Sequence, residues 1–485
     1  MNIKIHRGTH QIGGCVTEYE HDGYRLFVDY GEELPGGPKS GDLQIEGLTH
    51  GEISKSALLI THYHGDHIGN ITKLPKDLLI FMGKVGCEIQ KILSNRLKAV
   101  NTAHKEMLER LESIKTFEAG KEFKFGHFTI MPIVMDHSAF DAYAFKITAD
   151  GVTAFHTGDF RTHGFRSKKL PEVIDKYVGE VKYVVCEGTN VSRPTAASLP
   201  EHELQKQFKE AFAEHKSNIV YVSSTNVDRL FALYHAAIST GRKFIVDKYQ
   251  LAIMKQVVKL DPIWGKSKMY KFKEESMPMD LIFEDGEFNA NDKFKRLLEK
   301  VGYVLIARAN PFFDDLIERI PGEKQKYLSM WKGYVDPDND AYNETMAASV
   351  GKDYLYMHTS GHCDMDSMNK LFQMLHPRAI IPIHTDNPES FAKLFSEEWP
   401  VIVLNDGDSI SPISDSFADS TCAMVVSGRK KKCIGYFKSF EQARPALAHT
   451  VFGSIDTTRY EIFDEEDSSS NKTEKGLLSS LKETE

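Results

Sequence analysis

At positions 61–70 the chain reads Thr61-His62-Tyr63-His64-Gly65-Asp66-His67-Ile68-Gly69-Asn70. Its potential metal ligands are His62, His64, Asp66 and His67. The apolar run 57–60 comes directly before this stretch, and such a run followed by Gly and Asn is typical of a buried strand that leads into a polar loop. Imidazole and carboxylate groups suit zinc, and a short loop at a strand end can hold several of them. The stretch therefore predicts a metal site, with a polar surface loop as the alternative.

The length and composition limit the architecture and the class of protein. A chain of 485 residues exceeds the size of a usual single core, so we expect about two or three domains. A hydrophobic content of 41% and a charged content of 27% are typical of a soluble globular protein. The net charge of -9 argues against a uniformly basic nucleic-acid clamp. It leaves open a local basic groove or charge that is added by bound metal.

The cysteines and the apolar runs bear on the cellular compartment. No CxxC pair occurs among Cys15, Cys87, Cys186, Cys363, Cys422 and Cys433. This scatter predicts reduced, mostly buried thiols rather than a disulfide framework. The N-terminus turns polar too early for a signal peptide, and no apolar run approaches the ~18 residues that span a bilayer. We therefore expect a cytoplasmic protein without a membrane partner.

Further ligand-type residues follow other predicted strands. The run 128–134 leads to His137, 152–155 leads to Asp159, and 379–383 leads to His384. Strand ends on a shared rim can bring side chains that are distant in sequence to one centre. Two metal sites can be built from these residues, the first from His62, His64 and His137, and the second from Asp66, His67 and His384. Asp159 would then bridge two cations about 3.5–4 Å apart, and the water between them would lose a proton near neutral pH.

The middle of the chain has a different pattern. Helices are predicted over 201–214, 227–239 and 251–259, and short strands over 219–222, 243–246 and 303–306. This alternation is typical of an α/β domain. We expect a metal domain at 1–190 and 351–415 that an α/β insert at 191–350 interrupts. An extension at 416–463 has no assigned fold, and the polar tail at 464–485 is predicted to be disordered.

The order His62-x-His64-x-Asp66-His67, then His137, then Gly158-Asp159, resembles the signature of the metallo-β-lactamase superfamily. This resemblance implies an αββα sandwich with a dinuclear zinc site at one edge, and Asp29 fits the buried aspartate that supports the metal loop. Glu187, His362 and His384 stand in segments that resemble the three motifs of the β-CASP nucleases, whose α/β insert follows the first motif. The third motif is typically His in RNA-cleaving members, so His384 favours RNA.

Residues 1–410 are most similar to the ribonuclease J family, through segments 158–161, 224–229, 358–362 and 382–384. The resemblance implies 5′-to-3′ exonucleolytic or endonucleolytic hydrolysis of single-stranded RNA by a metal-bridging hydroxide. The implied cofactor is two zinc ions, with manganese as the alternative, and a homo-oligomer is left open. The predicted catalytic residues are Asp66, Glu187 and His362, with His362, oriented by Glu187, as general acid for the leaving 3′-oxygen.

Phosphate binding is predicted for His358, Ser360, Gly361 and Arg229. His358 could instead bond within its loop, and Arg229 could instead form a salt bridge within the insert. The basic run 429–432 is either a solvated turn or an RNA contact. Three other functions stay open: a DNA-processing β-CASP nuclease, a small-molecule thioester or lactone hydrolase, and a metal-binding scaffold without turnover.

Overall fold

The computed structural model describes residues 1–35, 37, 41–193, 198–261, 264–277, 283–284, 287–288, 292–411, 421–427, 430–437 and 460–464. The predicted tail at 464–485 lies outside these residues apart from its first position. Arg429 also lies outside them. In the part that is described, no helix is long and apolar enough to cross a membrane.

Two facing β-sheets form the larger domain, and hydrogen-bonded pairing gives the order of the strands in each sheet. The first sheet has the order β20-β1-β2-β3-β4-β5-β6, made of Ser409–Ile410, Asn2–Arg7, Val16–His21, Tyr24–Val28, Ser56–Ile60, Leu79–Gly83 and Lys115–Phe117. The second has the order β19-β11-β10-β9-β8-β7, made of Ala379–Ile383, Tyr183–Glu187, Val152–His156, Ala142–Ala149, Phe128–Met135 and Phe123–Phe125. Buried side chains of both sheets, among them Leu59, Phe145 and Val185, form one apolar core between them.

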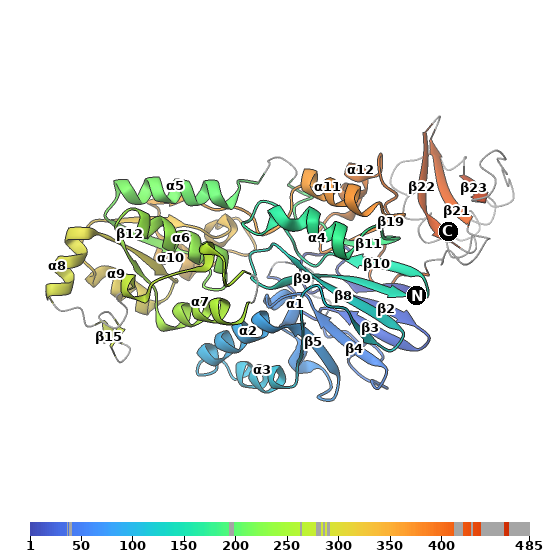
Figure 1. The fold of residues 1–485 in the computed structure, drawn as a ribbon, viewed down its shortest axis with the longest axis horizontal. Helices are drawn as coiled ribbons and strands as arrows, with labels where there is room; N and C mark the ends of the chain where they lie inside the picture. The colour runs from blue at the N-terminus through green and yellow to red at the C-terminus, as the bar shows by residue number, and fades with distance from the viewer. Residues whose placement is uncertain are drawn as a thin grey trace.

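Helices cover the outer faces of these sheets, as Figure 1 shows. On the first sheet lie α2 (Lys84–Leu97) and α3 (Ala103–Glu112), and on the second lie α4 (Leu170–Tyr177), α11 (Met365–Leu375) and α12 (Pro388–Phe395). Because an apolar sheet face must be covered, each outer layer has its own core. The predicted αββα sandwich is confirmed.

A separate sheet lies between β11 and β19 in the chain. Its order is β13-β16-β12-β17-β18, and every neighbouring pair is parallel. The strands are Lys243–Ile245, Tyr303–Ala307, Ser217–Tyr221, Lys324–Leu328 and Tyr354–Tyr356. The helices that connect them are α5 (Glu201–Glu214), α6 (Val227–Ser239), α7 (Lys248–Leu260), α8 (Asp292–Val301), α9 (Pro311–Arg319) and α10 (Glu344–Val350). The predicted α/β insert is confirmed, and its helices α5 and α6 have the predicted bounds.

The insert's sheet continues past the predicted boundary after residue 350. Strand β18 pairs with β17, Leu328 opposite Tyr356, so it belongs to the insert by its hydrogen bonds. We propose that the insert ends at Tyr356 and that the chain then returns to the larger domain through α11 and β19. A third sheet of β21 (Thr421–Ser427), β22 (Lys430–Phe437) and β23 (Tyr460–Asp464) follows these domains.

The parallel register of the second sheet aligns several strand ends. Strand β11 lies between β10 and β19, with His156 opposite Val185 and Glu187 opposite Ile383. The residues that follow these strands, Asp159 and His384, therefore leave the sheet at the same edge as Glu187. This edge is where the metal-ligand residues predicted from the sequence meet.

Candidate metal centre

The loop after β4 is tied to the end of β3 through Asp29. One Asp29 carboxylate oxygen accepts the Thr61 N–H at 2.7 Å, and the other accepts the Thr61 hydroxyl at 2.7 Å. Asp29 has a left-handed backbone, with φ of 61°. Gly31 then passes so close to Asp66 that an added Cβ would overlap the Asp66 carbonyl group. These contacts fix the loop that carries His62, His64, Asp66 and His67.

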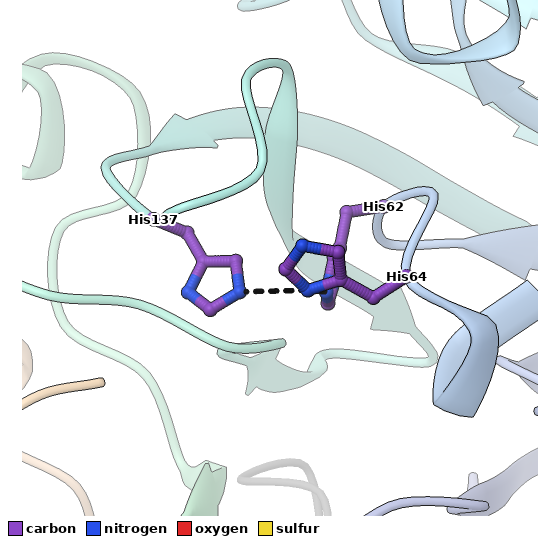
Figure 2. A group of neighbouring side chains, drawn as sticks. All are labelled: His62, His64 and His137. Carbon is purple, nitrogen blue, oxygen red and sulfur yellow. Dashed lines mark hydrogen bonds between the residues drawn. The ribbon is translucent and has the colours of Figure 1, made fainter. Parts of the chain in front are cut away.

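His62, His64 and His137 form the first group of ligand-type atoms. His62 Nε2 lies 3.1 Å from His64 Nδ1, and His137 Nε2 lies 3.3 Å from the same atom. Figure 2 shows the three rings converging, with His62 and His64 from the loop after β4 and His137 from the loop after β8. Their nearest nitrogens fall within 4.8 Å of one another. Three imidazole nitrogens at this spacing match a zinc donor set.

Asp66, His67 and His384 form the second group. His384 Nε2 lies 3.3 Å from Asp66 Oδ2, and His67 Nε2 lies 3.6 Å from the same oxygen. Asp159 lies between the two groups. Its Oδ2 is 3.9 Å from both His62 Nε2 and His137 Nε2, and its Oδ1 is 3.7 Å from His384 Nε2. Its Oδ2 also lies 3.2 Å from His67 Nε2, so one carboxylate contacts residues of both groups, as a bridging ligand would.

Hydrogen bonds on the far nitrogens orient these rings. His67 Nδ1 lies 2.7 Å from Asp29, and His137 Nδ1 lies 2.7 Å from the Gly361 carbonyl oxygen. His384 Nδ1 lies 2.9 Å from the Thr189 hydroxyl. Metal-bound histidines commonly donate their second N–H in this way, which leaves Nε2 free as the ligand atom. The arrangement fits bound metal without rearrangement of these side chains.

The protonation of the first group also fits a metal site. Burial lowers the pKa values of His62 and His137 well below the ordinary range, and it lowers the pKa of His64 to about 4. These imidazoles are therefore neutral at neutral pH, which is the form that binds a cation. Burial would raise the pKa of Asp159, but His384 and His67 overcome it and hold that pKa low. The first group thus offers neutral nitrogens, whereas at His67 the charges of Asp159, Asp66 and Asp29 overcome burial and raise the pKa well above its ordinary value.

Glu187 and His362 lie beside the two groups. Glu187 ends β11, and its Oε1 accepts the Phe160 N–H at 2.9 Å while Oε2 lies 2.9 Å from His362 Nδ1. His362 Nδ1 is also 3.8 Å from Asp159 Oδ2. Burial would lower the pKa of His362, but Glu187 and Asp159 overcome it and raise the pKa to about 9. In the metal-free protein His362 is therefore a cation at neutral pH.

Comparison with family models gives two matches. Residues 52–216 match the beta-lactamase superfamily domain, and residues 355–404 match the Zn-dependent metallo-hydrolase RNA specificity domain. The chain belongs to the metallo-β-lactamase superfamily. The first match contains most of the ligand-type residues, and the second contains His358, His362 and His384. The donor set described above therefore lies within a family of zinc-dependent hydrolases.

Several curated relatives are named ribonuclease J. The protein of Mycobacterium tuberculosis is 23% identical over 397 residues, which cover 78% of this chain and 67% of the relative. That of Mycolicibacterium smegmatis is 28% identical over 49% of this chain and 42% of its own length. That of Helicobacter pylori is 20% identical over 83% and 59%. The chain thus matches from less than half to about two thirds of these relatives' own length.

A solved structure supports the fold of this superfamily member. It is the crystal structure of a protein of unknown function from Enterococcus faecalis V583, with a TM-score of 0.62 and 18% identity. The superposition covers 84% of this chain and 99% of that one. At this identity the likeness concerns the fold alone.

The loop before α11 carries Ser360 and Gly361, which the sequence assigned to phosphate. The Ser360 hydroxyl accepts the His362 N–H at 3.0 Å and an amide N–H of Asn190 at 3.3 Å. At Gly361 an added Cβ would lie 2.7 Å from the Ser138 hydroxyl, so the glycine lets this loop pack against the loop of His137. Gly361 thus has a packing role beside the metal centre, and phosphate binding by this loop stays a prediction.

His358 is half-buried, and burial followed by the Arg229 charge lowers its pKa to about 3. A neutral His358 can form hydrogen bonds, but it carries no charge that would balance a phosphate. Its substrate role stays a prediction.

The phosphate-binding role of Arg229 is wrong. Its side chain is fully buried, and its guanidinium donates to both Glu201 oxygens, at 2.7 Å and 3.0 Å, and to the Ser329 hydroxyl. A fully buried guanidinium that is paired with a carboxylate is not presented to a substrate. The alternative, a salt bridge within the insert, is the one that the structure shows.

Other residues around the centre were not found from the sequence. Thr189 orients His384, and Asn190 donates to Ser360 and to the carbonyl oxygens of His362 and Cys363. Both stand within three residues after Glu187, in a segment for which the sequence predicts a role only for the carboxylate. Asp136 and Arg161 each stand next to a predicted ligand region, and they form part of a buried ion network. Their position beside His137 and Asp159 was the available signal.

Proposed function

We propose that this chain is a zinc-dependent ribonuclease that hydrolyses phosphodiester bonds of single-stranded RNA, as a 5′-to-3′ exonuclease, an endonuclease or both. The observation that carries this proposal is the Glu187–His362 pair beside Asp159, because a metal-ligand cluster alone would serve any hydrolase of the superfamily. The match of residues 355–404 to an RNA specificity domain supports RNA as the polymer. The names of the relatives point in the same direction.

The proposed site holds two ions. His62, His64 and His137 would hold one, Asp66, His67 and His384 the other, and Asp159 would contact both. Zinc, or manganese in its place, would supply an activated water and would neutralise charge on the phosphate oxygens. Asp29 keeps the Nδ1 of His67 engaged, so that Nε2 is presented to the site.

His362 acts as the general acid in this proposal. Its Nδ1 is held by Glu187, so the Nε2 proton is the one that can pass to the leaving 3′-oxygen as the P–O bond breaks. Glu187 is 1% exposed, and it both orients the ring and stabilises the imidazolium form. Ser360, whose hydroxyl lies on the same loop, would contact the phosphate. The Glu187–His362 pair thus supplies the proton that a 3′-alkoxide leaving group requires.

The test uses labelled RNA and DNA of one sequence, each with a 5′-monophosphate or a 5′-hydroxyl, and zinc- or manganese-loaded protein. His62→Ala is the inactive variant, and His50→Ala, whose ring is 49% exposed on the surface, is the matched control. We expect RNA cleavage by the wild type and by His50→Ala, and loss of cleavage in His62→Ala. A 5′-monophosphate preference would indicate the exonucleolytic mode. Cleavage of neither polymer, with esterase turnover that His62→Ala loses, would show a small-molecule hydrolase instead.

A further inference from the structure

Aromatic side chains gather at one edge of the insert's parallel sheet. Strands β17 and β18 run parallel, with Leu328 opposite Tyr356, so the chain leaves both strands at the same edge. Trp331 and Tyr334 come from the turn after β17, and Tyr356 is the last residue of β18. The carboxyl ends of parallel strands are the common place for ligand sites in α/β domains.

Two of these side chains, Trp331 and Tyr334, contact each other, and Trp331 also contacts an arginine. The Trp331 and Tyr334 rings lie edge to face, with centroids 5.6 Å apart, and the Arg193 guanidinium lies over the Trp331 ring at 5.1 Å. Tyr334 is 37% exposed and Tyr356 is 45% exposed, and Arg193 is exposed as well. We call Arg193, Trp331, Tyr334 and Tyr356 the aromatic ledge.

The aromatic ledge lies next to the metal centre. The backbone N–H of Arg193 donates to the Asn190 carbonyl oxygen at 2.9 Å. The Asn190 side-chain amide in turn donates to the Ser360 hydroxyl and the His362 carbonyl oxygen. Tyr356 leads directly into that same loop. The ledge therefore adjoins the loop that carries Ser360 and His362.

Exposed aromatic rings occur singly on many protein surfaces and need no explanation there. This group differs because two of its rings and a guanidinium contact one another, and because the third ring, Tyr356, leads into the loop of His362. Unpaired bases stack on aromatic rings and on arginine planes regardless of their sequence, whereas paired bases inside a duplex present no free face. The chemistry of the ledge thus suits an unpaired strand.

We propose that Trp331, Tyr334 and Tyr356 stack unpaired bases of the strand that enters the metal centre, and that Arg193 contacts its backbone phosphate. This proposal rests on the ribonuclease function proposed above and names the residues that would bind its single-stranded substrate. The ledge binds and positions the strand; it takes no part in bond cleavage. Its loss should therefore change KM more than kcat.

The test compares Trp331→Ala and Tyr356→Ala with the wild type on an oligoribonucleotide and on a version with abasic residues near the scissile bond. We expect KM for the intact oligomer to rise roughly 5- to 150-fold for each lost ring, the range for loss of one stacked base, with kcat little changed. On the abasic oligomer the variants and the wild type should differ little. Trp331→Phe should restore binding.

Tyr24→Ala is the matched control, because Tyr24 begins β3 at the end of the strand away from Asp29. Binding of the oligomer to the zinc-free protein, measured by fluorescence anisotropy, separates binding from turnover. The ledge proposal is wrong, while the ribonuclease proposal stands, if the wild type cleaves RNA and the ledge variants have the same KM as the wild type. It is also wrong if the variants raise KM by the same factor on the abasic oligomer as on the intact one. If the wild type neither binds nor cleaves RNA, the ribonuclease proposal itself fails.

Discussion

Glu201 joins the insert to the metal domain through buried ion pairs, and Glu201→Gln tests what this junction contributes. Its Oε1 accepts Arg161 Nη1 at 2.7 Å and Arg229 Nη2 at 2.7 Å, and its Oε2 accepts Arg229 Nε at 3.0 Å. Arg161 also pairs with Asp136 at 2.8 Å and with Asp228 at 3.2 Å. All of these side chains are at most 1% exposed.

The magnitude follows from the charge balance. The guanidiniums of Arg161, Arg166 and Arg229 face the carboxylates of Asp136, Glu201 and Asp228. Glutamine would keep the shape of Glu201 but remove its charge, which leaves one buried guanidinium charge without compensation. Breaking a buried pair in this way costs about 3–5 kcal/mol. With a urea m-value of about 3 kcal/mol/M, the unfolding midpoint should fall by about 1–1.7 M.

The pH dependence has a defined sign. Burial would raise the pKa of Glu201, but Arg229 and Arg161 overcome it and hold the pKa at about 2, below the value of 4.5 for the free side chain. Because this pKa is lowered on folding, ionised Glu201 stabilises the folded state above pH 4.5. This stabilisation is lost as the pH falls from 4.5 toward 2. The wild type should therefore lose its advantage over Glu201→Gln in this window.

The assay is urea unfolding followed by circular dichroism at pH 7 and at several acidic pH values. Glu210→Gln is the control, because Glu210 lies exposed on the same helix, α5. A Glu201→Gln midpoint equal to that of Glu210→Gln at pH 7 would refute the reasoning. So would an equal loss of stability in wild type and variant as the pH falls.

Three further predictions concern the site. Glu187→Gln should lower kcat on RNA by about 10²–10⁴-fold at unchanged metal content. It should also move the alkaline limb of the pH–rate profile to lower pH, because Glu187 raises the pKa of His362. An unchanged alkaline limb would show that His362 is not the general acid. Asp29→Ala should weaken metal affinity by about 10–100-fold, measured by competition with a chromogenic chelator, because the ring of His67 loses its partner; wild-type affinity would contradict this. Elemental analysis should find two zinc ions per chain in the wild type and fewer in His137→Ala, and a single ion in the fully active wild type would contradict the bridging role of Asp159.

The sequence predicted that these ligand-type residues would gather, because strand ends impose their positions. His137, Asp159 and His384 each follow an apolar strand, and parallel pairing aligns β10, β11 and β19 at one edge. The pairing partners of charged side chains obey no such local rule. Nothing near Arg229 in the sequence shows that Glu201, on another helix, would take up its donors. Strand β18 joins the insert's sheet beyond residue 350, where the sequence predicts the end of the insert, and its pairing with β17 is likewise a long-range contact without a local signal.

The route of the chain through the insert links substrate binding to catalysis. The chain leaves the metal domain at Glu187, forms the parallel sheet of the insert, and returns through the loop of His362. Glu187 therefore stands at the first connection to the insert, and His362, its partner in the proposed acid catalysis, stands at the second. The 2.9 Å contact between them therefore requires both connections to be in place. Arg161, directly after the segment of Asp159, reaches Glu201 at the start of α5 and holds the first connection near the centre. An insert displaced on this junction would separate Glu187 from His362 and would also move the Gly361 carbonyl oxygen that orients His137, while His62 and His64 would stay on their own loop. Acid catalysis thus depends directly on how the insert is docked, and metal binding depends on it through His137.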